Sequence, residues 1–323
     1  MEVLFAVFGI IVGLIILTIG GDILVDGAVS IARKWNVSVQ TIGLTIVAIG
    51  TSMPELVVSV IAAIEWKSEL AIGNILGTNI VNYLWILWVV LLITPITLTK
   101  TNKNIDLPLS AMAAFLLFIM VQDTFIEGSY INILSRIDGI ILILLAVLYI
   151  LFSLKYDFLS EKPLGGEVET ILSPFKSVLW ILWGIVALFT GGQILVNGAV
   201  DFARIIGISE TVIGLTIVAI GTSMPELMTS IVAVRKWKVW IAVGNLIGSS
   251  ILNILIILWV WSLLRPLPFL SGSSLDISLN ILIPWLILFL VHLNPRKILE
   301  RKVWMLFIIL YILYMTYLLI FRV

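Results

Sequence analysis

One fifteen-residue segment of this chain occurs twice, letter for letter. Residues 42–56, with the sequence IGLTIVAIGTSMPEL, recur as residues 213–227, an offset of 171 positions. A match of this length does not arise by chance, so the chain consists of two copies of one structural unit. The same offset, without a gap, aligns two further pairs of segments, 20–25 with 191–196 and 73–82 with 244–253.

Both copies are built from apolar segments. Hydrophobic residues make up 61% of the chain and charged residues 12%, with a mean hydropathy of +1.20, whereas soluble domains are about 45–50% apolar. This composition excludes a water-soluble globular protein. A membrane-spanning helix needs about 20 apolar residues, and ten segments meet this requirement, at about 3–31, 38–64, 70–93, 106–122, 131–154, 174–202, 209–234, 239–263, 275–293 and 303–321.

Each copy contains five of these predicted spans. Residues 1–154 form the first five-helix repeat, residues 174–323 form the second, and the polar segment 155–173 reads as a cytoplasmic linker between them. An odd number of spans makes the second copy enter the bilayer from the opposite side, as in secondary transporters with a substrate site near the midplane. The predicted fold is an all-α polytopic membrane protein with ten transmembrane helices in two inverted five-helix repeats.

The charged residues balance, with 19 Lys and Arg against 19 Asp and Glu, so no net charge favours binding of nucleic acid. The chain has no cysteine and a single histidine, His292, which excludes thiolate metal sites and Cys/His catalysis. The first residues lack the basic region of a secretory signal, so we interpret the apolar run after them as a retained membrane span. We expect a monomeric transporter, not an enzyme, with no bound cofactor.

The basic residues are distributed unequally between the two faces that these spans define. Cytoplasmic loops of membrane proteins carry an excess of Lys and Arg, so we expect a multi-pass protein of the cell membrane with both termini extracytoplasmic. The richer face carries Arg33, Lys34, Lys100, Lys103, Lys155, Lys162, Lys176, Arg235, Lys236, Lys238, Arg296, Lys297, Arg301 and Lys302. The other face carries Lys67, Arg136, Arg204, Arg265 and Arg322.

Two glutamates, Glu55 and Glu226, lie in the middle of predicted spans, and an ionisable residue at that depth is a functional candidate by default. Each follows the run Gly-Thr-Ser-Met-Pro. Because Pro54 and Pro225 cannot donate a backbone hydrogen bond, we expect both helices to kink or unwind there. Backbone of this kind is tolerated at membrane depth only where it is buried in protein or lines a cavity.

The residues around the two glutamates offer oxygen atoms only. Oxygen ligands suit a hard cation, and Ca²⁺ accepts six to eight of them at flexible geometry. Two carboxylates repel each other strongly at low dielectric unless a divalent ion, several monovalent ions or protons neutralise them. Asn82 and Asn253, paired by the repeat, add amide oxygens. The hydroxyl groups belong to Thr51, Ser52, Thr222 and Ser223.

The twin motifs GTSMPE and GN-x-x-G-[ST] resemble the two alpha-repeats of the cation/calcium exchanger superfamily, specifically its sodium/calcium exchanger branch. The resemblance covers both halves of the chain and implies exchange of Ca²⁺ for Na⁺ across the membrane. It also implies Ca²⁺ ligands at Glu55, Glu226 and the backbone carbonyls of Thr51 and Thr222. The Na⁺ ligands that it implies are the Ala48 carbonyl, Ser52 and Thr78 on one side, and the Ala219 carbonyl, Ser223 and Ser249 on the other.

The chain departs from part of this family at Asn253, where a number of members carry Asp. In the family an acid there accompanies K⁺ co-transport, so Asn253 argues against a K⁺ requirement. A centre with only two carboxylates could also be neutralised by two protons, which keeps H⁺/Ca²⁺ exchange open as the alternative. A channel and an intramembrane aspartyl protease fit less well, because the internal pseudo-symmetry makes a pore of several subunits unnecessary and the buried acids are Glu, not Asp.

Other acidic residues have less specific interpretations. Asp22 and Asp26, whose counterparts Gln193 and Asn197 are uncharged, either contact neighbouring helices and the interface or contribute to the ion pathway. A second group of acidic residues lies at the ends of predicted spans, where we expect the side chains to be solvated. Its members are Glu65, Glu69, Asp123, Glu127, Asp201, Glu210 and Asp276.

Overall fold

The structure, a computed structural model, describes residues 2–64, 68–122, 132–159, 172–207, 219–269, 273–296 and 298–321. Within these residues, eight helices are long and apolar enough to cross a membrane, or nine if one bent pair in the second predicted span counts as a single span. The sequence predicts ten spans. The remaining one, at 209–234, includes residues that lie outside the described part of the chain.

The first repeat begins with a 33-residue helix that is followed by shorter and partly π-helical segments. Its elements are α1 (Glu2–Lys34), α2 (Val39–Ile42), η1 (Gly43–Val47), α3 (Ala48–Thr51), α4 (Met53–Ile64), α5 (Ser68–Val81), η2 (Asn82–Ile86), α6 (Leu87–Ile93), β1 (Ile96–Thr97), η3 (Asn102–Asp106), α7 (Leu107–Met120), β2 (Asn132–Leu134) and α9 (Arg136–Leu159). The segments η1, η2 and η3 are π-helical.

The second repeat follows the same order. Its elements are α10 (Pro174–Ile205), α12 (Ala219–Thr222), α13 (Met224–Arg235), α14 (Val239–Leu252), π-helical η5 (Asn253–Ile257), α15 (Leu258–Leu264), β3 (Leu267–Phe269), α16 (Ser274–Leu293), β4 (Ile298–Leu299), 3₁₀-helical η7 (Arg301–Val303) and α17 (Trp304–Phe321). Ser173 caps α10, since its side chain accepts a hydrogen bond from the backbone N–H of Lys176 and Pro174 opens the helix.

Two predicted boundaries are wrong. The fourth span begins at about residue 102, not 106, because the π-helical turn η3 continues directly into α7. The fifth begins at Arg136, not 131, because β2 occupies the preceding residues, and α9 then runs to Leu159. The predicted linker at 155–173 therefore overlaps the end of α9, and its residues 160–171 lie outside the described part of the chain.

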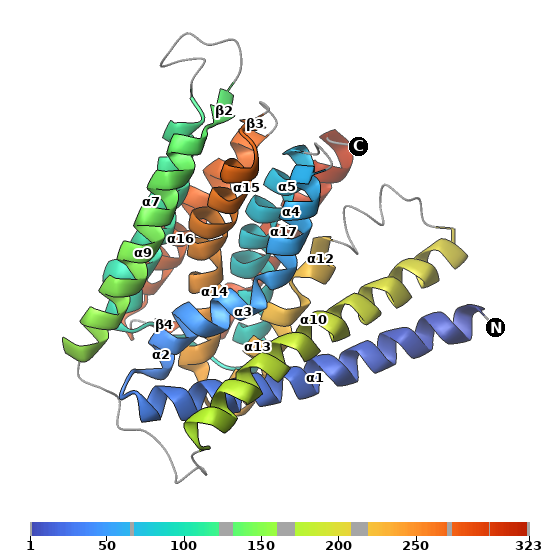
Figure 1. Ribbon diagram of the computed structural model, residues 1–323, viewed down its shortest axis with the longest axis horizontal. Coiled ribbons are helices and arrows are strands. Elements are labelled where there is room, and N and C mark those ends of the chain that lie inside the picture. Colours follow the sequence, from blue (N-terminus) through green and yellow to red (C-terminus); the bar gives the residue numbers. More distant parts are fainter. Residues whose placement is uncertain are drawn as a thin grey trace.

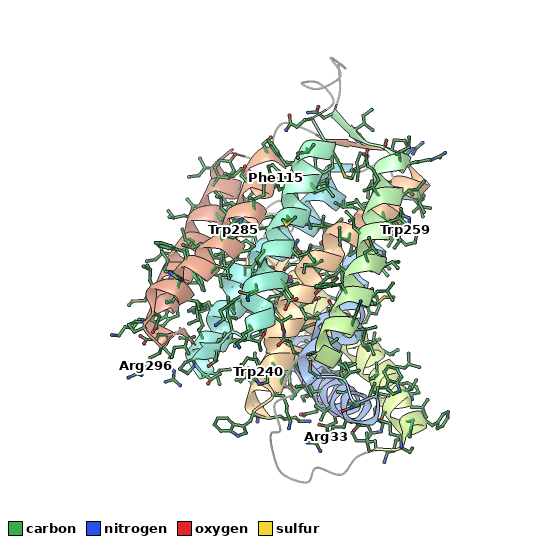
Figure 2. The ribbon with its side chains drawn as sticks, turned by 90° about the vertical axis from the view of Figure 1, so that its left-hand side faces the viewer. Arg33, Phe115, Trp240, Trp259, Trp285 and Arg296 are labelled. Atoms are coloured by element: carbon green, nitrogen blue, oxygen red, sulfur yellow. The ribbon has the colours of Figure 1, made fainter. Side chains whose placement is uncertain are left out.

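Two short antiparallel strand pairs connect loops at opposite ends of the bundle. Strand β1 pairs with β4, with Ile96 opposite Leu299, and β2 pairs with β3, with Asn132 opposite Phe269. Each pair joins one loop of the first repeat to one loop of the second. We call the end with β1 and β4 the basic end, because Arg33 and Arg296 lie there (Figure 2), and the end with β2 and β3 the opposite end.

Helices α1 and α10 lie side by side and cross the rest of the bundle obliquely (Figure 1). They pack through glycines. A Cβ atom at Gly20 would lie 2.9 Å from the backbone nitrogen of Leu188, and one at Gly191, its counterpart, 2.8 Å from that of Leu17. Leu17 is in turn the counterpart of Leu188, so the contact obeys two-fold symmetry. Small residues allow this close backbone approach between membrane helices.

The remaining helices differ in how much protein surrounds them. The stretch from α14 through α15 is almost wholly buried, whereas only 22% of the apolar stretch of α1 and 17% of that of α17 is buried. Phe115, Trp259 and Trp285 lie on the outside of the bundle (Figure 2), where Phe115 and Trp285 are about half exposed. Apolar side chains on the outside and polar ones at the centre are the reverse of a soluble protein, as a bilayer requires.

Candidate ion-binding site

The repeated GTSMPE motif breaks its helix in both copies, as the sequence predicts. Helix α3 ends at Thr51 and α4 begins at Met53, with an angle of 43° between the two parts of the span. Ser52 has φ −81° and ψ 9°, and Ser223 in the second copy has φ −84° and ψ 4°. The prolines that follow lack an N–H, and each sits in the first turn of the next helix, where that loss costs least.

Each break places a glutamate in the first turn of the helix that follows it. Glu55 in α4 and Glu226 in α13 are both completely buried. Neither carboxyl oxygen of Glu55 has a hydrogen-bond partner among the described residues, and of Glu226 only Oε1 has one, from the Ser52 hydroxyl at 3.4 Å. A helix N-terminus stabilises a carboxylate by about 0.3–1 kcal/mol, which is well below the cost of burying an unpaired charge. The arrangement therefore calls for a bound cation or proton.

Hydroxyl groups from both repeats lie next to the two carboxyls. Thr78 and Thr222 lie beside the carboxyl of Glu55. Thr51 and Ser52 lie beside that of Glu226. Each glutamate thus faces a hydroxyl from the broken helix of the other repeat, so the two copies build one site together.

The Thr51 side of the site is closed by hydrogen bonds to α14. The Thr51 hydroxyl donates to Oδ1 of Asn245 at 2.9 Å and lies 3.4 Å from the hydroxyl of Ser249. Ser249 also donates to the backbone carbonyl of Ala48 at 3.5 Å. On the other side, Asn74 donates to the backbone carbonyl of Glu55, also at 3.5 Å. Ala219, the counterpart of Ala48, is the first residue of α12.

Two asparagines occupy the centre of the bundle, at the start of η2 and η5. Both side-chain polar atoms of Asn82 are buried without a partner among the described residues. Asn253 donates to Oδ1 of Asn79 at 3.0 Å, while Oδ1 of Asn253 itself has no partner in the described ranges. Asn79 in turn donates to the backbone carbonyl of Ser250, its own repeat counterpart, at 2.9 Å. π-Helical turns are frequent at functional sites, and here two of them begin at the paired asparagines.

Some buried polar residues in this region are not among those that the sequence analysis singled out. Ser59 and Ser230 lie one turn beyond Glu55 and Glu226, and Thr229 lies beside Ser230; all three hydroxyls are buried and lack partners among the described residues. The spacing Glu-x-x-x-Ser, which puts the serine on the same helix face, was the available signal. One expectation is wrong: Asp276 is not solvated but 1% exposed, and it accepts a hydrogen bond from Tyr314 at 3.2 Å.

The site is thus a set of buried oxygen atoms. Within the part of the chain that the structure describes, no three His, Cys, Asp or Glu side chains come together, so the charged ligands are limited to two carboxylates. Around them stand hydroxyl and amide oxygens, several without a hydrogen-bond donor. This donor set fits a hard cation such as Ca²⁺ or Na⁺ and does not fit a soft transition metal.

Comparison with known proteins also indicates a protein that binds Ca²⁺ or Na⁺. A family model described as sodium/calcium exchanger protein matches residues 5–155 and 176–321. The chain belongs to the sodium/calcium exchanger family. This exchanger is 30% identical to the sodium/calcium exchanger MaX1 of Methanosarcina acetivorans over 324 residues, which cover 90% of this chain and 92% of the relative.

Two further similarities extend over most of this exchanger. The putative antiporter CaxA of Alkalimonas amylolytica is 36% identical over 269 residues, covering 81% of this chain and 82% of the relative. A solved structure of the sodium-calcium exchanger NCX_Mj, soaked with Na⁺ and Sr²⁺, superposes with a TM-score of 0.80 at 30% identity and covers 97% of this chain and 99% of the other. Membership of this family makes the chain a multi-pass membrane transporter.

Proposed function

We propose that this exchanger moves Ca²⁺ across the membrane in exchange for Na⁺, with both ions bound in turn at the site between the two repeats. The observation that carries the proposal is the pair of completely buried carboxyls, three of whose oxygen atoms have no hydrogen-bond partner in the part of the chain that the structure describes. One Ca²⁺ cancels the charge of two carboxylates, and so do Na⁺ ions bound in its place. Because the two loads compete for the same charges, the site supports exchange.

The proposed Ca²⁺ ligands are Glu55 and Glu226 with the backbone carbonyls of Thr51 and Thr222. The proposed Na⁺ ligands use the neutral oxygens on either side, with Asn82 and Asn253 completing the centre. These are the carbonyls of Ala48 and Ala219 and the hydroxyls of Ser52, Thr78, Ser223 and Ser249. Alternating access then requires α1 and α10 to move together against the rest of the bundle, in a scaffold of ten helices in two inverted repeats.

The proposed orientation places the basic end in the cytoplasm and both termini outside. The support for it is the excess of Lys and Arg in the short loops at that end. No partner other than the bilayer and the transported ions is needed, and the proposed working unit is a monomer.

Purified protein in liposomes tests the proposal directly. With Na⁺ inside and Ca²⁺ outside at one fixed pH on both sides, we expect Ca²⁺ uptake that stops when the Na⁺ gradient is removed. Glu55→Gln and Glu226→Gln should each lower uptake by at least about 30-fold, since leaving one partner of a buried charge pair unmatched costs about 2 kcal/mol or more. Asp276→Asn, which neutralises a buried carboxyl elsewhere, serves as the folding control and should transport normally.

The same liposomes separate the proposal from its alternative, H⁺/Ca²⁺ exchange through the same two glutamates. That alternative is favoured because the described residues bring no third carboxylate to the site, so two protons would neutralise it. Uptake driven by a pH gradient in the absence of Na⁺, with no response to a Na⁺ gradient at fixed pH, would replace Na⁺ by H⁺. Unchanged uptake in both glutamine variants would reject the site itself.

A further inference from the structure

Helices α5 and α14 meet at a pair of residues that the repeat relates to each other. Asn79 in α5 donates from its side-chain amide to the backbone carbonyl of Ser250 in α14 at 2.9 Å, and Ser250 is the counterpart of Asn79. Both side chains are buried. Asn253, one turn after Ser250 at the start of η5, donates to Oδ1 of Asn79 at 3.0 Å. The three residues thus form one chain of hydrogen bonds in the middle of the bundle.

The Ser250 carbonyl sets the direction of every bond in this chain. A backbone carbonyl only accepts hydrogen bonds, so Asn79 must turn its NH₂ group toward it, and its Oδ1 atom then faces Asn253. That oxygen also only accepts, so Asn253 must present its own NH₂ group. The oxygen of Asn253 lies on the other edge of the same amide and has no partner among the described residues. Each of the two amides is therefore held in one orientation.

The side chain of Asn253 lies on the helix face that borders the ion-binding site. Residues four apart on a helix share a face, and Asn245, Ser249 and Asn253 follow one another at this spacing. The α-helical pattern extends to Asn253, whose backbone N–H donates to the carbonyl of Ser249. The Thr51 hydroxyl lies 2.9 Å from Oδ1 of Asn245 and 3.4 Å from the Ser249 hydroxyl, and α4, which carries Glu55, packs against η5. Asn253 thus continues the row of polar side chains that lines the site.

The described residues show no equivalent of this chain at the other central asparagine. By the repeat, the match of the bond from Asn253 to Asn79 is a bond from Asn82 to Ser250. The Ser250 hydroxyl instead donates to the carbonyl of Leu246, in its own helix, at 2.9 Å. Neither polar atom of the Asn82 side chain has a partner in the described ranges. The contact of α5 with α14 therefore orients one central amide and not the other.

We propose that Asn79 is a positioning residue for ion binding, which holds the amide of Asn253 with its oxygen toward the transported ions. This inference rests on the proposed function and adds a residue to its site. Ca²⁺ takes six to eight oxygen ligands, and an amide presents to it either an oxygen, which binds, or an NH₂ group, which repels. Because Asn79 accepts from the NH₂ group, the oxygen is in place before the ion arrives.

Calorimetry of Ca²⁺ binding to the purified protein, in Na⁺-free buffer, tests the role of Asn79 without a transport assay. Loss of a residue that orients a metal ligand typically costs 10- to 100-fold in affinity, so Asn79→Ala should raise the Ca²⁺ dissociation constant by about this factor. Ser250→Ala, the matched change in the second repeat, keeps the backbone carbonyl and should leave the constant unchanged. The same rise in both variants would mean that packing of α5 against α14 matters and not the orientation of Asn253, and would overturn the proposal.

The variant Asn253→Asp separates orientation from packing. Both polar atoms of its carboxylate are oxygens, so no rotation of the group replaces an oxygen by a donor. With its NH₂ group held by the Ser250 carbonyl, Asn79 would face this carboxylate with an oxygen. Adding Asn79→Ala to Asn253→Asp should therefore leave the Ca²⁺ dissociation constant unchanged or lower it. An equal rise with and without Asn253→Asp overturns the proposal, as does the absence of a rise in Asn79→Ala alone.

Uptake into liposomes distinguishes failure of this proposal from failure of the proposed function. In Asn79→Ala, Na⁺-driven uptake should need a higher Ca²⁺ concentration by the same factor, without a matching fall in the maximal rate. If the parent protein binds Ca²⁺ but does not take it up in response to Na⁺, the proposed exchange fails, and calorimetry still decides the role of Asn79. If the parent protein binds no Ca²⁺, the ion site is rejected and the role of Asn79 with it.

Discussion

In the repeat, α10 is the counterpart of α1 and α4 is the counterpart of α13. The contact of α1 with α13 should therefore have a match between α10 and α4, yet these two regions differ. A Cβ atom at Gly21 of α1 would lie 3.2 Å from Cγ2 of Val232 in α13. At the counterpart Gly192 of α10, the nearest atoms belong to Pro225 and Leu17, at 3.9 and 4.0 Å, and none of them belongs to α4. Val232 is 2% exposed, whereas its counterpart Ile61 is 49% exposed.

This difference gives an expectation for the conformation of the exchanger. Helix α13 runs from the site toward the basic end, and α1 covers it. Helix α4 runs from the site toward the opposite end, and α10 leaves its Ile61 face uncovered. In a transporter of two inverted repeats the second conformation is the first with the roles of the repeats exchanged. If the fold has the proposed two inverted repeats, we expect this conformation to be closed toward the basic end and open toward the opposite end.

The largest expected effect is a difference in chemical accessibility. The chain has no cysteine, so single cysteines introduce unique thiols. With a membrane-impermeant thiol reagent, Ile61→Cys should react about 10- to 1,000-fold faster than Val232→Cys, because the minor conformation of such an equilibrium is populated at about 0.1–10%. Mass spectrometry of the labelled protein gives both rates. Equal rates would show that the regions around Ile61 and Val232 do not differ in accessibility.

The sequence predicts the symmetric features of this molecule because their causes are local. Proline and glycine act within one helical turn, so the break at Ser52 and Ser223 and the placing of a glutamate after it follow from the motif alone. The asymmetry could not be predicted in this way. Residues 42–56 and 213–227 are identical, and the conformation in which they are found depends on how α1 and α10 pack against the bundle.

Two buried acids show the same limit. A charged residue near the end of a span is normally solvated, which is why the sequence predicts that position for Asp276 and gives no reason to single out Asp106. Their burial depends on partners distant in the chain. Gln40 lies 66 positions from Asp106, and Tyr314 lies 38 positions from Asp276. Hydropathy and spacing within one segment contain no information about such contacts.

A pair of glycine variants should shift the equilibrium between the observed conformation and the exchanged conformation in opposite directions. Gly21→Leu overfills the contact with α13, and overpacking costs about 1–3 kcal/mol, so it should disfavour the observed conformation. At Gly192 an added Cβ makes only ordinary van der Waals contacts, so Gly192→Leu should disturb the observed conformation less and should instead oppose the exchanged conformation. The readout is the labelling rate of Ile61→Cys, which is remote from Gly21. An energy of this size shifts the equilibrium by about 5- to 150-fold. Because the observed conformation is the major one, at about 90–99.9%, the labelling rate in Gly21→Leu should fall by less, up to about 15-fold.

Gly192→Leu is the matched control for that experiment and should leave the rate of Ile61→Cys unchanged or slightly raised. The same fall in both variants would mean that any bulky residue between these helices disturbs the protein. The difference between the α1–α13 region and the α10–α4 region would then not explain the labelling rates.

The smallest expected effect concerns an ion-pair cluster that only one of the two regions has. Lys236, just after α13, lies 2.6 Å from Oδ1 of Asp26 and 3.1 Å from Oδ1 of Asp22, both in α1. In the second repeat the counterparts of these acids are uncharged, and Gln193 instead donates to Asn197 at 2.9 Å. The cluster therefore holds α1 against α13 and favours the observed conformation.

Lys236→Gln should shift the equilibrium by no more than about fivefold, which lowers the labelling rate of Ile61→Cys by less than about twofold. The reason is that these side chains are 27–49% exposed, and ion pairs in contact with solvent contribute no more than about 1 kcal/mol. Raising the salt concentration should reproduce part of this fall in the parent protein, because ions screen exposed charges. Arg204→Gln, which removes an exposed ion pair with Asp201 within α10, should have no effect. If it lowers the rate as much as Lys236→Gln does, the contact between α1 and α13 is not what the charges stabilise.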